Sequence, residues 1–222
     1  MKYQNTLRAQ FVERLNRFSA VVELKGKRET VHVKNTGRCS ELLQCGKSVV
    51  LQKAQNPARK TQYDLISAYK DSLGWVNIDA QAPNHVVREW LESGTSCFSV
   101  IDYLKPEFQY GTSRVDFYLE CGARKILLEV KECTLEVDGI GYFPDAPTQR
   151  GIKHLYELTR AVKEGYECYI AFVIAMPGVE LVYPNTQTHP EFALALTEAV
   201  NAGVQVLKLP CVVGPDELSI VK

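Results

Sequence analysis

Arg114-Val115-Asp116-Phe117-Tyr118-Leu119 and Leu128-Glu129-Val130-Lys131-Glu132 are the two stretches that decide the fold of this 222-residue sequence. Both have the alternation of a β-strand, in which successive side chains point to opposite faces of a sheet. Asp116 therefore points away from the apolar face of its strand, while Glu129 and Lys131 share one face of theirs. If the two strands pair as a hairpin, the two carboxylates and the ammonium group meet on one side of the sheet.

Two carboxylates in close contact repel each other unless a cation lies between them, and Mg²⁺ and Mn²⁺ favour such oxygen ligands. Lys131 beside them would hold and polarise a water molecule for attack on a phosphodiester. The sequence therefore predicts Asp116, Glu129 and Lys131 as catalytic residues, with Asp116, Glu129 and Glu89 as ligands of Mg²⁺ or Mn²⁺. The alternative is a solvated hairpin with an exposed Glu–Lys pair, and a solvated helix face for Glu89.

The chain from Asn84 onward alternates helical and extended patterns. Asn84 is expected to cap a helix that runs to Leu91, and Pro147 and Gly165 bracket a second helix. The order helix, three strands, helix, strand predicts an α/β core with a mixed sheet over residues 84–222. The ranges expected for its elements are helices 84–91, 148–164 and 190–202, and strands 98–108, 114–119, 125–132, 168–175, 180–183 and 204–209.

The first 83 residues contain short apolar and β-branched stretches separated by turn sequences such as Asn35-Thr36-Gly37 and Asn56-Pro57. Short strands at this spacing favour a small barrel or sandwich. We expect a five-stranded OB-like β-barrel over residues 1–83, so the chain as a whole is predicted to have two domains, of mixed α+β and α/β character. The strands expected in the barrel are 9–12, 18–24, 30–33, 48–53, 64–69 and 75–78.

Charge is divided unevenly between these two regions, although the 26 basic and 26 acidic side chains of the whole chain cancel. Residues 1–83 contain 14 Lys and Arg against 7 Asp and Glu, and residues 84–222 contain 12 against 19. The basic half is suited to a polyanion and the acidic half to carboxylates that hold a cation. Chance variation in surface charge is the alternative explanation.

Four basic residues of the first half lie in two polar turns and are predicted to bind nucleic acid: Lys34, Arg38, Arg59 and Lys60. Loops at one rim of an OB-type barrel are where such modules bind nucleic acid strands. Aromatic residues for base stacking are sparse in this half of the chain.

The helix expected at 148–164 begins after two prolines that bracket Asp145, and either Asp145 or Thr148 is expected to cap it. Arg150, Lys153 and His154 gather near its start, where cations and a helix N-terminus suit a phosphate group, so all three are predicted to bind nucleic acid. An ordinary solvated helix face is the alternative. The buried stripe is expected to contain Ile152, Leu155, Tyr156, Thr159 and Val162.

The seven cysteines include no C-x-x-C pair, which argues against a disulfide framework and against structural zinc. No apolar run reaches the roughly 18 residues of a membrane helix, and the start of the chain lacks the apolar stretch of a secretion signal. The expectation is a cytoplasmic protein without a membrane partner.

Several strings in this sequence resemble the SfsA (sugar fermentation stimulation protein A) family, and the D-x12-E-x-K pattern of residues 116–131 resembles the PD-(D/E)xK nuclease superfamily. The strings are His32 with Asn35-Thr36-Gly37, Arg59-Lys60, Pro83-Asn84, Tyr110-Gly111, Ser113-Arg114-Val115-Asp116-Phe117, Glu129-Val130-Lys131, Phe143-Pro144-Asp145-Ala146, Arg150-Gly151 and Lys153-His154-Leu155.

The resemblance implies an N-terminal OB-like domain, a C-terminal PD-(D/E)xK nuclease-like domain of αβββαβ order, DNA binding and a link to the regulation of sugar utilisation genes. It places Asp116, Glu129 and Lys131 in the nuclease-like site and implies no defined reaction. The sequence departs from the family at Gln149, where Glu is frequent, and at Lys34, where Pro or another residue is common.

Three functions remain open from the sequence. The first is a DNA-binding protein with little sequence specificity, regulating sugar utilisation genes, in which the nuclease-like domain is a scaffold with a metal site. The second is an active Mg²⁺-dependent DNA endonuclease. The third is a protein-interaction module that does not touch nucleic acid. The basic first half favours the first two, and resemblance of fold does not establish activity.

Overall fold

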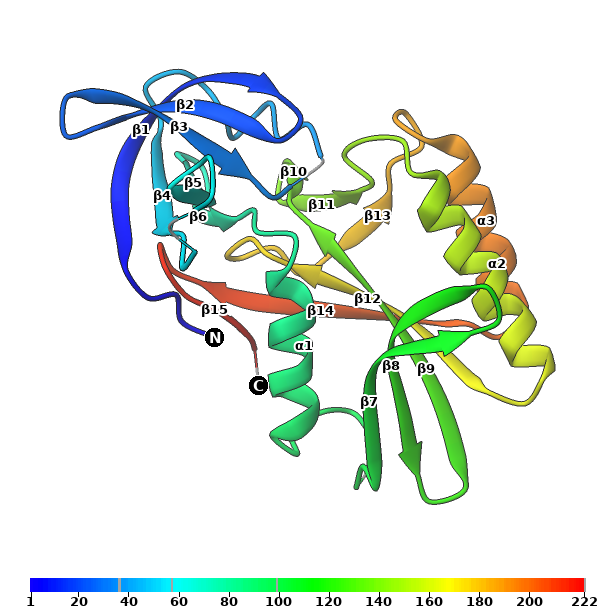
Figure 1. Ribbon diagram of the computed structural model, residues 1–222. Coiled ribbons are helices and arrows are strands. Elements are labelled where there is room, and N and C mark those ends of the chain that lie inside the picture. The colour runs from blue at the N-terminus through cyan, green and yellow to red at the C-terminus, as the bar shows by residue number, and fades with distance from the viewer. Residues whose placement is uncertain (36, 57, 99, 222) are drawn as a thin grey trace.

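The computed structural model describes residues 1–35, 37–56, 58–98 and 100–221. Thr36 and Pro57, which belong to two of the expected turns, and Ser99, which belongs to an expected strand, lie outside the described residues, as does Lys222. The described chain forms a barrel from its first third and a larger sheet with three helices from the rest, side by side (Figure 1).

The first six strands form one sheet in the order β3-β2-β1-β4-β5-β6, and an additional parallel pairing of β3 with β5 closes five of them into a barrel. The fold class predicted for this region is confirmed. Apolar side chains alternate into the barrel, and Val22, Val31, Leu51 and Leu65 are fully buried there. The bounds are β1 Thr6–Asn16, β2 Ser19–Leu24, β3 Lys27–Val33, β4 Ser48–Lys53, β5 Tyr63–Lys70 and β6 Gly74–Asn77.

The remaining elements form a mixed sheet in the order β15-β14-β12-β9-β8-β7, parallel at its centre and antiparallel toward both edges. Helix α1 packs on one face, and α2 and α3 pack together on the other (Figure 1). The expected αβββαβ order and mixed sheet are confirmed. The bounds are α1 Ala82–Glu92, β7 Tyr103–Tyr110, β8 Ser113–Cys121, β9 Arg124–Cys133, α2 Gln149–Lys163, β12 Glu167–Ile174, α3 Pro190–Asn201, β14 Gln205–Val213 and β15 Leu218–Ile220.

A small third sheet was not expected from the sequence. Strands β10 (Leu135–Val137) and β11 (Ile140–Phe143) form a hairpin, and β11 also pairs in parallel with β13 (Val182–Pro184). The first strand of the mixed sheet, β7, begins at Tyr103 and not at Phe98. Phe98 instead packs edge to face against Tyr169 in the core. Its apolar side chain fits a buried loop residue as well as a strand residue, so the sequence did not distinguish the two.

Two expectations about the helices are wrong. The N-cap of α1 is Gln81, so Asn84 lies inside the helix. On α2 the buried residues include His154 and Glu157, while Tyr156 is 54% exposed. The buried face of α2 thus includes polar side chains that were expected to face solvent. It packs against the part of the sheet that carries Glu129.

The barrel is joined to the mixed sheet by backbone and side-chain contacts. Tyr3 N donates to Asp216 O at 2.8 Å, and Asn77 N donates to Ala175 O at 3.0 Å. Val50 and Ile66 of the barrel belong to the apolar cluster that also contains residues of α1 and β9. No helix within the described residues combines the length and apolar character needed to span a membrane.

Candidate metal and nucleic acid site

The site is created where two neighbouring strands separate. Strands β8 and β9 pair along a ladder that runs from the pair Cys121 and Arg124 to the pair Phe117 and Leu128. Beyond that point the two strands separate, and β8 stays paired with β7 while β9 stays paired with β12. Asp116 lies next to Phe117, in the part of β8 that does not pair with β9. Its Oδ2 accepts a hydrogen bond of 2.7 Å from Val130 N, so the carboxylate occupies the place of a backbone partner in the ladder.

Asp116 is held from a second side by α1, because Asn84 Nδ2 donates to its Oδ1 at 2.9 Å. The pKa of Asp116 is raised above its ordinary value, first by burial and then by the negative charge of Glu129. After the larger effect of burial, repulsion from the Glu129 carboxylate thus disfavours ionisation of Asp116. A cation between them would remove that repulsion.

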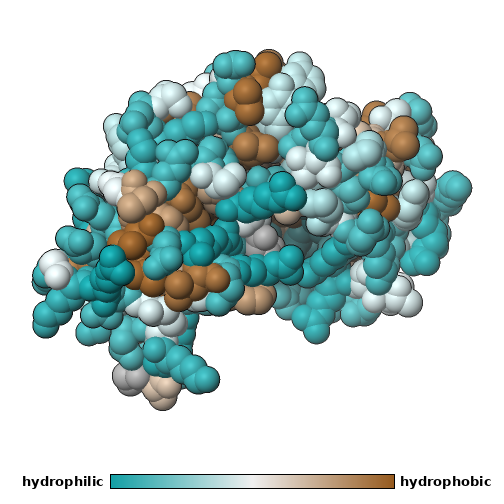
Figure 2. All heavy atoms as spheres, turned by 90° about the horizontal axis from the view of Figure 1, so that it is seen from above, coloured by the Kyte–Doolittle hydropathy of each residue, from teal (hydrophilic) through white to brown (hydrophobic). Residues whose placement is uncertain are grey.

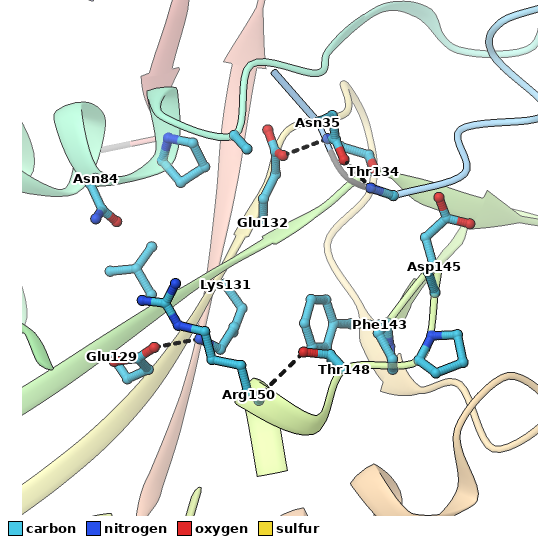
Figure 3. Close-up of a pocket in the computed structure, with 18 of the residues that line it drawn as sticks. Asn35, Asn84, Glu129, Lys131, Glu132, Thr134, Phe143, Asp145, Thr148 and Arg150 are labelled. Atoms are coloured by element: carbon cyan, nitrogen blue, oxygen red, sulfur yellow. Dashed lines mark hydrogen bonds and ion pairs between the residues drawn. The ribbon is translucent and has the colours of Figure 1, made fainter. Parts of the chain in front are cut away.

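Glu129 is buried, with 3% of its side chain exposed, and its Oε1 contacts both Lys131 Nζ and His154 Nδ1 (Figure 3 shows the Lys131 contact). Burial alone would raise the pKa of Glu129, but the charge of Lys131 and the hydrogen bond from His154 lower it below the ordinary value. Glu129 is therefore an ionised carboxylate inside the protein, with an ammonium group on the same oxygen.

His154 connects Glu129 to the surface. Arg150 Nε donates to His154 Nε2 at 3.3 Å, which leaves Nδ1 of the ring as the donor toward Glu129. His154 is 6% exposed. Neither the predicted contact with phosphate nor the alternative of a solvated face fits His154, because the ring is buried and both of its nitrogens are engaged.

A cavity of about 500 Å³ opens over these groups, between the barrel and the mixed sheet (Figure 3). Its walls come from four places: the barrel, the segment that leads into α1, the separated strands and the loop before α2. The residues that carry the chemistry of the cavity are Arg17, Asn35, Asn84, Asp116, Glu129, Lys131, Glu132, Asp145, Thr148 and Arg150.

The loop before α2 ties the barrel to the cavity. Thr148, not Asp145, caps α2, since its Oγ1 accepts from Gly151 N at 3.1 Å. Asp145 Oδ2 instead accepts from Cys39 N of the barrel at 2.7 Å. A Cβ on Gly37 would lie 2.9 Å from both Asn35 Oδ1 and Asp145 Oδ2, so the close approach of the barrel loop requires glycine.

Glu132 is a member of the cavity that the sequence did not single out. Its Oε2 accepts from Asn35 Nδ2 at 2.9 Å, while its buried Oε1 has no hydrogen-bond partner among the described residues. Burial, followed by the charge of Asp79, raises the pKa of Glu132 well above its ordinary value. The sequence did not indicate that Glu132 lines the cavity, because strand alternation assigns it to the face opposite Glu129 and Lys131.

Glu89 does not join this cavity. Its carboxylate, 57% exposed, pairs with the N-terminal ammonium group of Met1 at 2.7 Å. On α1 it is Asn84, more than one turn earlier, that faces Asp116. The assignment of Glu89 as a metal ligand is therefore corrected, because the helix register turns it toward the chain terminus.

The donor set fits a divalent cation with few protein ligands. Across residues 1–35, 37–56, 58–98 and 100–221, no group of three or more His, Cys, Asp or Glu side chains is arranged to hold a metal ion. Of the four carboxylates that line the cavity, Asp116 and Glu129 lie at the strand split. Mg²⁺ characteristically binds through one or two carboxylates, with water and substrate phosphate as its other ligands.

The six other residues predicted to bind nucleic acid divide into two groups. Lys34 Nζ lies 3.0 Å from Asp79 Oδ2, and Arg59 Nη2 lies 2.7 Å from Asp64 Oδ1, so acidic partners already neutralise both cations. They line a second cavity of about 590 Å³. The four that are exposed are Arg38, Lys60, Arg150 and Lys153.

The structure defines a two-part protein, in which a closed OB-type barrel is joined to a mixed αβββαβ sheet. Asp116, Glu129 and Lys131 line the cavity at the strand split. The family model "SfsA N-terminal OB domain" matches residues 12–78, and "Sugar fermentation stimulation protein RE domain" matches residues 81–217. The chain belongs to the sugar fermentation stimulation protein (SfsA) family.

Relatives of similar length support the assignment. The sugar fermentation stimulation protein homologue of Desulfitobacterium hafniense is 50% identical over 218 residues, covering 98% of this chain and 94% of the relative. The homologue of Ruminiclostridium cellulolyticum is 50% identical over 222 residues, covering 100% and 97%. The structure of Pyrococcus furiosus SfsA in complex with Ca²⁺ superimposes with a TM-score of 0.88 at 27% identity, covering 99% of this chain and 95% of that one.

Proposed function

We propose that this protein binds DNA in the groove between its barrel and its mixed sheet and hydrolyses phosphodiester bonds there with Mg²⁺ or Mn²⁺. The observation that carries the proposal is the strand split, because it brings Asp116, Glu129 and Lys131 into one cavity. Seen from above, the surface is hollowed between the two parts of the molecule, with hydrophilic side chains around the hollow (Figure 2).

Each residue has a distinct part in this proposal. Asp116 and Glu129 would hold the cation, which when bound supplies Lewis-acid polarisation of the phosphodiester. Lys131 keeps Glu129 ionised and presents an ammonium group beside the position of attack. The Ca²⁺ complex of the Pyrococcus furiosus relative supports a divalent cation in a protein of this fold.

The decisive experiment compares the wild-type protein with Lys131→Met on supercoiled, linear and single-stranded DNA and on RNA. Methionine keeps the length and apolar stem of lysine but removes its charge. We expect the wild type to cleave in Mg²⁺ or Mn²⁺ and not in EDTA, and the variant to cleave about 100-fold more slowly, the magnitude typical of a lost acid–base or charge-stabilising group.

DNA binding measured in EDTA is the control, because Lys131→Met should retain most of it. Equal cleavage by both proteins would assign the activity to a contaminant or another site. DNA binding by the wild type without cleavage under any condition would reject the hydrolytic function and leave the regulatory DNA-binding one.

A second prediction concerns the exposed and neutralised cations. Each phosphate contact that a Lys or Arg makes contributes roughly 0.7–0.9 to the slope of log affinity against log salt concentration. Lys60→Ala should reduce that slope by the contribution of about one phosphate contact. Arg59→Ala, at the neighbouring residue, should change the slope much less. The reason is that Asp64 accepts two hydrogen bonds from Arg59, at 2.7 and 3.0 Å, and raises the pKa of its guanidinium.

Titrations of labelled DNA at four or more salt concentrations measure both slopes. Arg38→Ala, which also removes an exposed charge of the barrel, is the matched comparison for Lys60→Ala. A larger change for Arg59→Ala than for Lys60→Ala would show that the ion pair with Asp64 opens on binding.

A further inference from the structure

The turn between β1 and β2 carries an aromatic residue that the turn itself does not need. Asn16 pairs with Ser19, so Arg17 and Phe18 are the two residues of the turn. Neither residue has the left-handed backbone that favours Asn, Asp or Gly in a tight hairpin, so the turn does not select for a particular side chain. Phe18 is 55% exposed, and so it gains little from burial either. An aromatic ring that the turn does not require and the core does not cover is available for a contact outside the chain.

The backbone of this turn is fixed although the Phe18 ring is exposed. Phe18 N donates to Asn16 Oδ1 at 2.8 Å, and Phe18 O accepts from Val33 N at 2.9 Å. Arg14 Nη2 donates to Arg17 O at 2.8 Å, which anchors the other residue of the turn. A ring presented on a rigid turn can bind a ligand with little loss of conformational entropy.

The turn lies at the edge of the proposed site. Arg17 lines the same cavity as Asp116 and Glu129. In Figure 1 the β1–β2 turn is on the side of the barrel that faces β11 and α2. Arg14 also binds the carbonyl oxygens of Gly37 and Arg38, at 2.8 and 2.6 Å, so the turn and the barrel loop of the cavity form one unit.

Other aromatic residues of the barrel are less available. Tyr69 is 37% exposed and packs edge to face on Trp75, with 5.2 Å between ring centroids. Arg8 covers Trp75, 5.5 Å from the centroid. Tyr63 packs against the apolar core. Phe18 is the aromatic side chain of the described barrel that exposes the largest fraction of its surface.

We infer that Arg17 and Phe18 form a nucleotide subsite, in which Arg17 contacts a phosphate of the strand that enters the cavity and Phe18 stacks on the base of an unpaired nucleotide. This inference rests on the proposed function and specifies its substrate class. A base inside a duplex is already stacked on both faces, while a base in a single strand offers a face to an aromatic ring. The subsite therefore favours single-stranded or locally opened nucleic acid.

The test measures binding of a single-stranded oligonucleotide that contains 2-aminopurine, and of its duplex, in EDTA so that no strand is cut. Phe18→Ala should weaken single-strand binding about tenfold, the scale of one lost base–aromatic stack, and abolish the 2-aminopurine quenching seen with the wild type. The salt slope should not change. Phe18→Trp should restore both affinity and quenching, and Arg17→Gln should lower the slope instead.

Leu15→Ala is the matched control, because Leu15 is 51% exposed on the same hairpin and has no ring. An equal loss of affinity in Leu15→Ala, or an equal loss on duplex, would overturn the stacking subsite. No loss in Phe18→Ala, with normal binding by the wild type, would overturn it as well and leave the proposed function intact. Failure of the wild type to bind any nucleic acid would reject the proposed function itself.

Discussion

Asparagine in place of Asp116 is expected to abolish metal-dependent cleavage, lowering the rate by at least about 10³-fold, which corresponds to ~4 kcal/mol of transition-state stabilisation. Asparagine has the shape of aspartate but no charge, so its amide oxygen is a much weaker ligand for a divalent cation shared with Glu129. Its Oδ1 can still accept from Val130 N, and the Asn84 amide can turn to accept from the new Nδ2. We therefore expect the variant to fold.

The stability of the same variant should change in the opposite direction. The raised pKa of Asp116 means that its ionised carboxylate is unfavourable in the folded protein without a cation, because of burial and then of Glu129. Asp116→Asn should melt at or above the temperature of the wild type in EDTA. Mn²⁺ should stabilise the wild type, since a ligand that binds the folded state shifts the unfolding equilibrium, and should leave the variant unchanged.

Calorimetric titration with Mn²⁺, melting curves and cleavage rates measure these effects. Glu89→Gln is the matched control, because it also removes one carboxylate but from a position paired with the N-terminus. It should keep metal binding and cleavage within about twofold of the wild type. If Glu89→Gln and Asp116→Asn lose metal affinity equally, the assignment of the cation to the strand split is wrong.

Replacing Glu132 by glutamine is expected to stabilise the protein at neutral pH, since a carboxyl group whose pKa is raised by folding destabilises the folded state where the unfolded chain is ionised. For a chain of this size, each gain of about 1 kcal/mol raises the melting temperature by roughly 2–4 °C. Burial and the charge of Asp79 raise the pKa of Glu132, and its Oε1 has no hydrogen-bond partner in the described part of the chain. Glutamine still has an oxygen that can accept the hydrogen bond from Asn35, and its side chain is neutral at every pH.

The pH dependence has a definite sign. Folded Glu132 binds its proton more tightly than the unfolded chain does, so the stability of the wild type falls as pH rises above the unfolded pKa of about 4.3. Glutamine does not titrate. The advantage of the variant should therefore be absent below about pH 4 and should grow as pH rises, up to the pKa of the folded state.

Urea unfolding at pH values from 4 to 8 measures this difference. Glu92→Gln, which breaks an exposed ion pair with Arg88, is the control and should change the unfolding free energy by less than about 1 kcal/mol at every pH. A constant difference between Glu132→Gln and the wild type at all pH values would show that folding does not raise the pKa of Glu132.

The alternation of apolar and polar residues, together with the residues typical of turns, was sufficient to predict the architecture. Short strands with Gly and Asn turns indicated the barrel, and the switch to longer periodic segments after Pro83 indicated the mixed sheet. These signals are local, because each depends on which face of one element is apolar. The pair of short strands β10 and β11 escaped prediction, since three or four residues are too few to show a period.

The site was predicted in part. The E-x-K spacing identified a carboxylate and an ammonium group on one face, and the structure brings both into a cavity with Asp116. Their catalytic roles stay a prediction. Glu89 and His154 were misread because helical periodicity gives relative angles between residues but not which angle faces the sheet.

Charge was the least informative signal. Lys34 and Arg59 count as cations in the sequence, yet Asp79 and Asp64 neutralise them in the barrel. The partners lie 45 and 5 residues away along the chain. Pairing of this kind depends on strand register, which composition does not contain.

The sequence by itself determined the family, the two kinds of fold and the strands that carry the acidic and basic groups, because these follow from residue periodicity and short strings. Only the tertiary structure decided that the β8–β9 ladder stops at Asp116, that Asn84 and Glu132 border the cavity, and that the barrel turn of Arg17 and Phe18 lies at its edge. Those relations join segments distant in sequence. They are set by the packing of the barrel against the sheet, which no local pattern encodes.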